Sequence, residues 1–293
     1  MATGLSIAST SNFSSGQKVL VADAKMAYEA AAPDPDLIDQ HRIPQGRKQW
    51  DILTYARLTR ASALTEGVDL SSSQQLVAAS LSITPTEHGV IATLSNRLVR
   101  RQGDANVVSS AGKMLANSLR RRQALDVVSL YDGFNTSHPG SGALDITAFR
   151  GAVAYLLTDN DPGYGPAPLP LHASLHIEQI SDIIEQISDT APRGTTSGFT
   201  DELLQRWWKG SDRLYGVQIF HSGIIERASD STAKGGLFAK EALAMVMANN
   251  ADVTEQQDHS LRAVEYGIFQ EWGEGERADV HGVEVHSDAA ATI

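Results

Sequence analysis

Residues 61–92 limit most strongly how this chain can fold. Apolar residues alternate there with Ser, Thr and Gln over about 30 positions, and Gly67, Pro85 and Gly89 are the breaks in the pattern. Such alternation predicts a long excursion of two β-strands. A ribbon of two strands buries too little apolar surface to be stable alone in water. We therefore expect this excursion to pack against another chain.

The next segment predicts a long basic helix. Residues 92–132 have a helical pattern that is interrupted near Gly103 and Asp104, and Gly133 ends it. An apolar stripe follows the second part of this helix through Val108, Ala111, Leu115, Leu119, Leu125 and Val128. Its other faces carry Arg97, Arg100, Arg101, Lys113, Arg120, Arg121 and Arg122.

The remaining segments alternate between helices and strands. Residues 1–35 are rich in Ala, Ser and Thr and predict an extended arm. Helices are expected at 146–157, starting at Asp145 or Thr147, and at 177–188 and 200–209. Strands are expected at 169–175 and 214–220, with strand-like runs around 260–272 and 279–288. This order predicts a mixed α+β fold.

Composition and charge exclude several classes of protein. The chain has no Cys, which rules out disulfides and thiolate chemistry, and no apolar run approaches the length that spans a bilayer. The N-terminus lacks the pattern of a secretory signal, so we expect a protein that is not exported and has no membrane partner. The net charge of -11 argues against nucleic-acid binding by the whole chain.

The charge is unevenly distributed. Residues 41–122 hold 12 Lys and Arg against 5 Asp and Glu, whereas the rest of the chain holds 12 basic and 30 acidic residues. A subunit polarised in this way can meet a polyanion or an acidic neighbour with its basic part.

No motif assigns an enzymatic reaction. The phosphate-binding glycine loops and the G-x-S-x-G nucleophile motif are missing, and His172 with His176 lacks a third metal ligand. Glu178, Asp182 and Glu185 share one face of a predicted helix, a pattern more typical of a solvated face than of a metal site. We assign no catalytic, cofactor-binding or metal residue. A metal-dependent hydrolase is kept as an alternative.

The order of elements resembles the Hong Kong 97 phage-type capsid fold. The stretch ALTEGVDL (63–70) with SITPTEHGVIATLSNRL (82–98) is similar to the extended loop of that family and its return strand. Further similar stretches are PLHASLHIEQISDI (170–183), GVQIFHSGII (216–225) and GGLFAKEALAMVM (235–247). The resemblance covers roughly residues 50–290, and the order of the motifs carries it more than any one of them.

The resemblance implies five segments. They are an N-terminal arm (1–50), an extended β-loop (51–92), the spine helix with peripheral-domain elements (93–160), an axial domain (161–245) and returning β-strands of the peripheral and axial body (246–293).

The resemblance also implies a function and partners. We expect a major capsid protein that assembles in the host cytoplasm into pentamers and hexamers of an icosahedral phage head, the virion component around double-stranded DNA. Expected partners are a portal, a decoration protein and a separate scaffolding protein, since the front of the chain lacks the roughly 100 residues of a fused scaffold. A related alternative is the shell of an encapsulin-like cellular compartment.

Two further expectations concern contacts between subunits. No Lys lies between Lys48 and Lys113, so the family's isopeptide cross-link from a loop Lys is chemically excluded here. The candidate contact residues are Arg97, Arg100, Arg101, Arg120, Arg121 and Arg122 of the helix, with Glu66 and Asp69 of the loop. The sequence leaves open whether the arginines face DNA or the acidic surfaces of neighbouring subunits.

Overall fold

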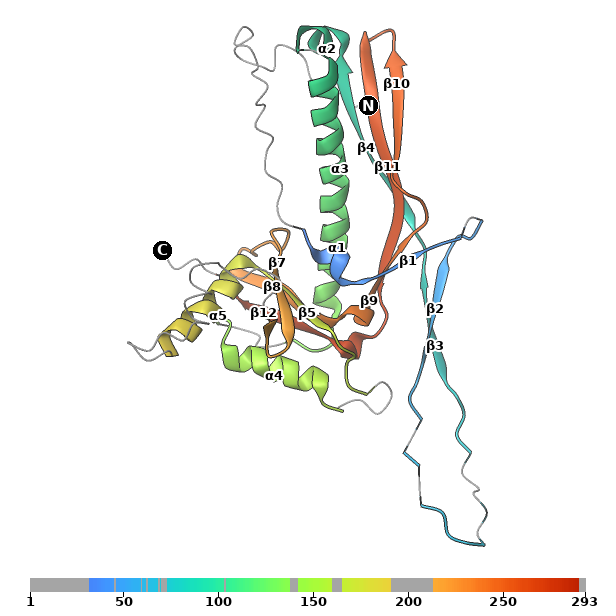
Figure 1. Cartoon of the computed structure of the whole chain (residues 1–293), viewed down its shortest axis with the longest axis vertical. Helices are drawn as coiled ribbons and strands as arrows, with labels where there is room; N and C mark the ends of the chain where they lie inside the picture. The colour runs from blue at the N-terminus through green and yellow to red at the C-terminus, as the bar shows by residue number, and fades with distance from the viewer. Residues whose placement is uncertain are drawn as a thin grey trace.

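The computed structural model consists of two packed bodies and a projecting hairpin (Figure 1). It describes residues 32–44, 46–58, 60–61, 63–67, 69, 73–102, 104–137, 142–159, 165–190 and 213–289. For residues 101–102, 104–108 and 188–190 only the backbone is described.

The first body is a long sheet covered on one face by a helix. Its strands are β1 (Asp39–Arg42), β4 (Thr86–Ser95), β9 (Leu243–Met247), β10 (Asp252–Asp258) and β11 (Ala263–Glu276). The strand β11 is central, because it pairs antiparallel with β4, β10 and β9, while β1 is parallel to β9. Figure 1 shows how far β4, β10 and β11 extend beside the helix α3 (Asp104–Ser129).

Apolar side chains of α3 fix it to the sheet. Leu115, Leu119 and Val127 are buried against Ile268 and Trp272 of β11. Trp272 is fully buried, and its indole Nε1 donates a hydrogen bond of 3.1 Å to Asp126 on the helix. A short helix, α2 (Asn96–Gln102), precedes α3, and the Ser95 hydroxyl accepts from the backbone N–H of Leu98 at its start. The 3-10 helix η2 (Leu130–Gly133) follows α3.

The second body is a five-stranded sheet packed against two helices. Its strand order is β12 (Gly282–Asp288), β8 (Thr232–Ala239), β5 (Leu171–Leu175), β7 (Val217–His221) and β6 (Arg213–Leu214). The helices α4 (Ile146–Leu157) and α5 (Ile177–Thr190) cover it, with Phe149, Leu156, Ile180 and Ile183 in their shared core. Every residue of β5 is buried, as expected for a central strand covered on both faces.

The remaining elements are short helices and the two strands of the hairpin. They are α1 (Asp34–Leu37), the hairpin strands β2 (Trp50–Tyr55) and β3 (Ala78–Ile83), η3 (Lys240–Ala242) and η4 (Asp279–His281). No helix in the described ranges is long and apolar enough to cross a membrane.

The mixed α+β fold is confirmed, and the structure changes three details. Residues 84–92, expected in the excursion, mostly belong to β4, because this strand finds its partner in β11 rather than in β3. Leu125 is exposed, since Ala124 and Val127 continue the buried stripe of α3 instead. The strands β1, β8, β9 and β10 are not predicted from the sequence. The arm up to residue 31 and the helix at 200–209 lie outside the described residues, and the five-segment division stays a prediction.

Candidate assembly surfaces

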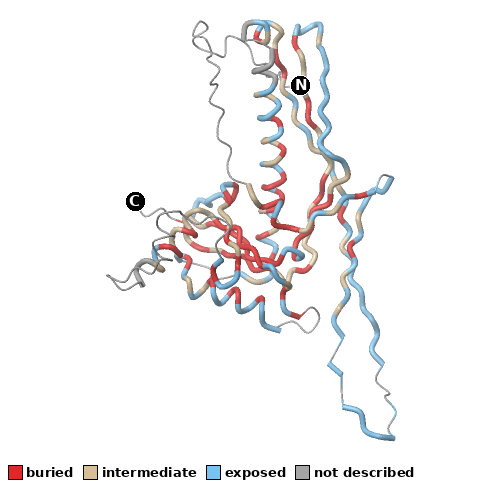
Figure 2. The backbone as a smooth tube through the Cα atoms, in the orientation of Figure 1, coloured by how far each residue is buried: buried red, intermediate tan, exposed pale blue. Residues whose placement is uncertain are grey.

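In the described part of the β2–β3 hairpin, the buried residues lie at its root. Its strands pair antiparallel from Trp50 opposite Ile83 to Tyr55 opposite Ala78. Near the root, Ile52 and Ile83 are buried in a small cluster with Ile43, Ala244 and Val246. Beyond the root the hairpin projects from the molecule, and most of its described length is exposed (Figure 2).

Large apolar side chains cover this exposed part of the hairpin. Between 51% and 72% of the surface of each is open to solvent, and they are Leu53, Tyr55, Leu58, Leu64, Leu76 and Val77. Single exposed apolar residues are ordinary on a protein surface, but six on one ribbon indicate a contact surface. The sequence-based expectation that this segment needs a partner agrees with this geometry.

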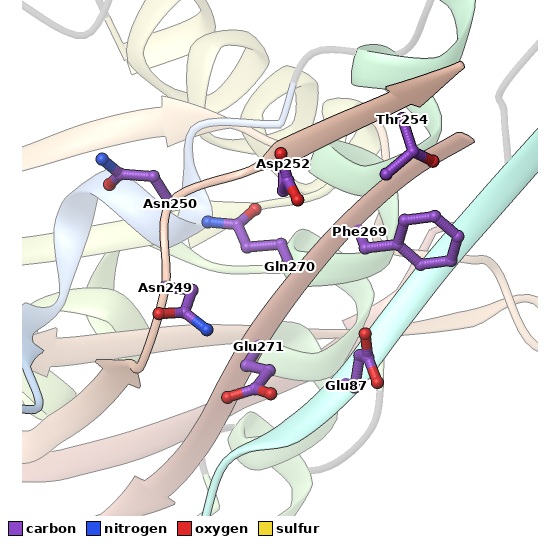
Figure 3. A pocket seen from close by; sticks show the side chains of 8 residues that line it. All are labelled: Glu87, Asn249, Asn250, Asp252, Thr254, Phe269, Gln270 and Glu271. Atoms are coloured by element: carbon purple, nitrogen blue, oxygen red, sulfur yellow. The ribbon is translucent and has the colours of Figure 1, made fainter. Parts of the chain in front are cut away.

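The face of the long sheet that points away from α3 is a second candidate surface. Phe269 lies there between Gly89 of β4 and Gly267 of its own strand, and a Cβ on either glycine would collide with its ring. A shallow pocket of about 270 Å³ lies beside this ring, and Figure 3 shows the side chains that line it. Its lining residues are Glu87, Asn249, Asn250, Asp252, Thr254, Phe269, Gln270 and Glu271. Three carboxylates and an aromatic ring suit a contact with a basic, partly apolar segment.

Two of these carboxylates lie directly opposite each other. Glu87 of β4 and Glu271 of β11 are cross-strand partners. Like charges in such positions destabilise a sheet. A positive group supplied from outside would remove this repulsion.

The strand β10 forms an edge of the sheet. Its first six residues are exposed, and in the described part of the chain it pairs with β11 alone. Asp252, Glu255 and Asp258 on this strand give it negative charges of the kind that discourage unspecific edge-to-edge pairing.

The predicted basic residues have different surroundings. Arg97 and Arg100 are exposed on α2, and the side chain of Arg101 lies outside the described part. Arg120 forms an ion pair with Asp36 and donates to the carbonyl oxygen of Ala32 at 3.2 Å. Arg122 pairs with Asp126 one turn along the helix, with 2.9 Å between Nε and Oδ1.

The other predicted residues lie on exposed surface. Arg121 is exposed on α3, and Glu66 and Asp69 are exposed near the end of the hairpin. Of the predicted set, Arg120 and Arg122 thus serve contacts within the subunit, and Arg120 fixes the segment around α1 to the helix.

A buried polar cluster that the sequence did not reveal joins the two bodies. The carboxylate of Asp34 has no exposed surface and accepts hydrogen bonds from three hydroxyl groups. They are those of Tyr131 at 2.9 Å, Ser174 at 2.5 Å and Ser222 at 2.6 Å. Burial, together with the charge of Asp34, raises the pKa of Tyr131 well above its ordinary value. In the sequence, Asp34 appears only as part of a Pro-rich turn.

The residues considered for metal or acid–base chemistry include His172, His176 and Asp182, and all three lie on or next to β5 and α5 of the second body. Burial lowers the pKa of His172 and of His176, and the Nδ1 atom of His176 accepts from the N–H of Glu178 at the start of α5. Asp182 accepts from the N–H of Leu144 at 3.1 Å, and burial raises its pKa. In the described ranges, no three His, Asp or Glu side chains are grouped as metal ligands.

Comparison of the whole chain with solved structures identifies the fold. The head protein of Helicobacter pylori bacteriophage KHP40 matches with a TM-score of 0.72 and 12% identity, over 98% of this chain and 100% of that one. A Mycobacterium phage Che8 structure matches with a TM-score of 0.65 and 14% identity, over 88% and 92%. The chain has the Hong Kong 97 phage-type capsid fold.

In terms of this fold, α3 is the spine helix and the β2–β3 hairpin is the extended loop. The fold is also present in the capsid of a native GTA particle, which matches with a TM-score of 0.62 and 10% identity over 90% of this chain and 94% of that one. No protein-family model and no curated protein sequence matches the chain. The low identities explain why the resemblance rests on the order of elements.

Proposed function

We propose that this chain is a shell subunit, the major capsid protein of an icosahedral phage head around double-stranded DNA. The extended hairpin carries this proposal, because it presents six large apolar side chains that its own subunit does not cover. Full burial of a side chain of this size contributes about 1.5–3 kcal/mol. Contact with a neighbouring copy would offset the entropy cost of ordering the hairpin, and rings of five and six subunits repeat that contact throughout a closed shell.

The shell is held together without covalent cross-links from the extended loop. No Lys lies between Lys48 and Lys113, so the hairpin carries no amine that could form an isopeptide bond. Non-covalent contacts of apolar side chains and ion pairs therefore hold it on a neighbour. A separate scaffolding protein directs assembly, a portal occupies one vertex, and a decoration protein binds outside.

Arg97 and Arg100 are the basic residues that support contacts beyond the subunit. Both are exposed on α2, whereas Arg120 and Arg122 have carboxylate partners in their own chain. The strands β4, β10 and β11 carry acidic residues and no Lys or Arg, and this favours pairing of the arginines with a neighbouring copy. Contact with packaged DNA would be independent of base sequence.

Assembly of the purified chain tests the proposal. The chain is expressed with and without a scaffolding protein encoded beside it and studied by negative-stain microscopy and sedimentation velocity. Closed particles of uniform size are expected. Material that stays monomeric in all conditions would contradict the proposal. Native particles that enclose a protein cargo instead of nuclease-protected DNA would overturn the phage-head assignment and favour a cellular compartment.

A further inference from the structure

The extended hairpin has a second attachment to its own subunit, beyond its root. The guanidinium of Arg57, just after β2, lies 2.8 Å and 3.1 Å from the two carboxylate oxygens of Asp159. Arg60 adds a longer contact of 3.7 Å to the same carboxylate. Asp159 follows the C-terminal end of α4, so the contact joins the hairpin to the second body.

The local structure leaves room for this contact. Gly165 has a φ of +77°, and a Cβ at this position would lie only 2.8 Å from Nη1 of Arg57. A side chain here would therefore both strain the backbone and displace the guanidinium. The Nη2 atom of Arg57 donates to both carboxylate oxygens of Asp159, and its Nη1 atom lies against Gly165. The single ammonium group of a Lys could not make both contacts.

The contact is strong enough to direct the hairpin but not to stabilise the fold. Arg57 and Asp159 are 41% and 37% exposed, and ion pairs at such positions contribute about 0.2–1 kcal/mol. At the root, by contrast, Ile52 and Ile83 are buried in an apolar cluster. The root thus fixes where the hairpin starts, and the ion pair restricts the direction in which it points.

We propose that Arg57, Arg60 and Asp159 form a clasp that holds the hairpin of the free subunit in the direction it needs for binding a neighbouring copy. The clasp acts by preorganisation: a hairpin that is already oriented loses less conformational freedom when it binds. This inference rests on the proposed function, because orientation matters only if the hairpin binds another copy. Arg57 and Asp159 are positioning residues, and the exposed apolar side chains of the hairpin supply the binding energy.

Charge reversal and its rescue test the clasp. The variants are Arg57→Asp, Asp159→Arg and the double variant with both changes, and Arg150→Asp on the exposed surface of α4 is the matched control. Hydrogen exchange in the unassembled subunit is measured at Ala56, whose N–H bonds to the carbonyl oxygen of Val77 at 3.0 Å. We expect exchange to be about two- to fivefold faster in each single variant and to return toward the wild-type rate in the double variant.

Assembly provides the second readout. The protein concentration required for assembly should rise by the same two- to fivefold factor in each single variant, and the double variant should need less protein than either. High salt should reduce the difference between wild type and Arg57→Asp, because it screens exposed ion pairs. The clasp is disproved if exchange in the single variants equals that of the Arg150→Asp control, or if the double variant is no better than they are. A wild-type chain that never assembles would refute the proposed function, while hydrogen exchange would still decide whether the clasp exists.

Discussion

Asp34 shows how one residue can hold separate parts of this molecule together. Its buried carboxylate has hydroxyl donors from η2, from β5 and from Ser222 just after β7. A buried carboxylate without hydrogen bonds would be very costly, so each donor matters. No local pattern predicts the cluster, because residues 34, 131, 174 and 222 meet only in the folded chain.

Removing one hydroxyl donor from Asp34 should destabilise the fold. The change Tyr131→Phe keeps the buried ring and removes a hydrogen bond to a charged group, which should lower the free energy of unfolding by about 1.5–3 kcal/mol. Urea denaturation followed by circular dichroism measures it. Tyr215→Phe is the control, since Tyr215 is about half exposed. Equal stability of the two variants would show that the Tyr131 hydroxyl contributes nothing.

His176 should make the subunit sensitive to acid. Burial lowers its pKa from 6.5, with Glu178, His221 and Arg227 as the charged groups around it. A lowered pKa means that the folded chain favours the neutral ring. The stability that this provides is present above about pH 6.5 and is lost as the pH falls below that value.

A substitution that keeps the helix cap isolates this effect. His176→Asn retains an acceptor for the N–H of Glu178 but does not titrate. Between pH 7 and pH 5, the urea midpoint should fall less in this variant than in the wild type. The two changes in midpoint are compared with each other, because buried acids such as Asp182 shift the stability of both proteins equally in the opposite direction. The exposed His259 provides the control variant His259→Asn. Parallel pH profiles for His176→Asn and the wild type would contradict the prediction.

At the scale of elements, the sequence predicts the bounds of a helix or strand well where the cap and the apolar pattern lie within that segment. The helix α4 begins and ends as expected, because the Asp145 side chain accepts from the N–H of Thr147 and the apolar period is regular. The strand β10 (DVTEQQD) was missed, since it has almost no apolar residues and exists by pairing with β11. The alternation in residues 84–92 predicts a strand but not its partner, so the sequence places most of β4 in the excursion although this strand pairs with β11.

Substitution of exposed apolar side chains of the hairpin should reduce assembly and leave the stability of the fold nearly unchanged. The changes Leu58→Ser and Leu64→Ser alter side chains that are 51% and 72% exposed, so the free energy of unfolding should change by no more than about 0.5 kcal/mol. Particle yield should fall severalfold, because the contact loses apolar area. Light scattering and microscopy measure the yield. Leu261→Ser, at the turn between β10 and β11, is the control, and normal yield from the double variant would remove the main support for the hairpin as an interface.

At the scale of the whole molecule, the distribution of charge bears on two proposed roles for the arginines of α2. These roles are contact with a neighbouring copy and contact with DNA. The candidate residues Arg97 and Arg100 were predictable by type, but the sequence could not show that Arg120 and Arg122 are engaged within the subunit. Such engagement depends on distant or neighbouring carboxylates whose positions only the fold determines. The described surfaces place exposed arginines on α2 and acidic residues along the strands of the same body.

Reversing the charge of α2 should impair assembly even without DNA. The variant Arg97→Glu with Arg100→Glu should fold normally and should form empty shells less efficiently by a factor of several, with a weaker dependence on salt than the wild type. Sedimentation velocity at low and high salt measures both. Arg150→Glu is the control. Normal empty shells with reduced DNA content would instead assign these arginines to DNA.

The central position of β11 also determines when the first body can form during synthesis. Three strands of its sheet, β4, β9 and β10, pair with residues 263–276, close to the C-terminal end of the described chain. A nascent chain that lacks these residues cannot form this sheet, and the β4 segment and the apolar face of α3 stay uncovered until residues 263–276 have been translated. The first body therefore folds only after residues 263–276 have been synthesised, and its demand for chaperones should grow with the rate of synthesis.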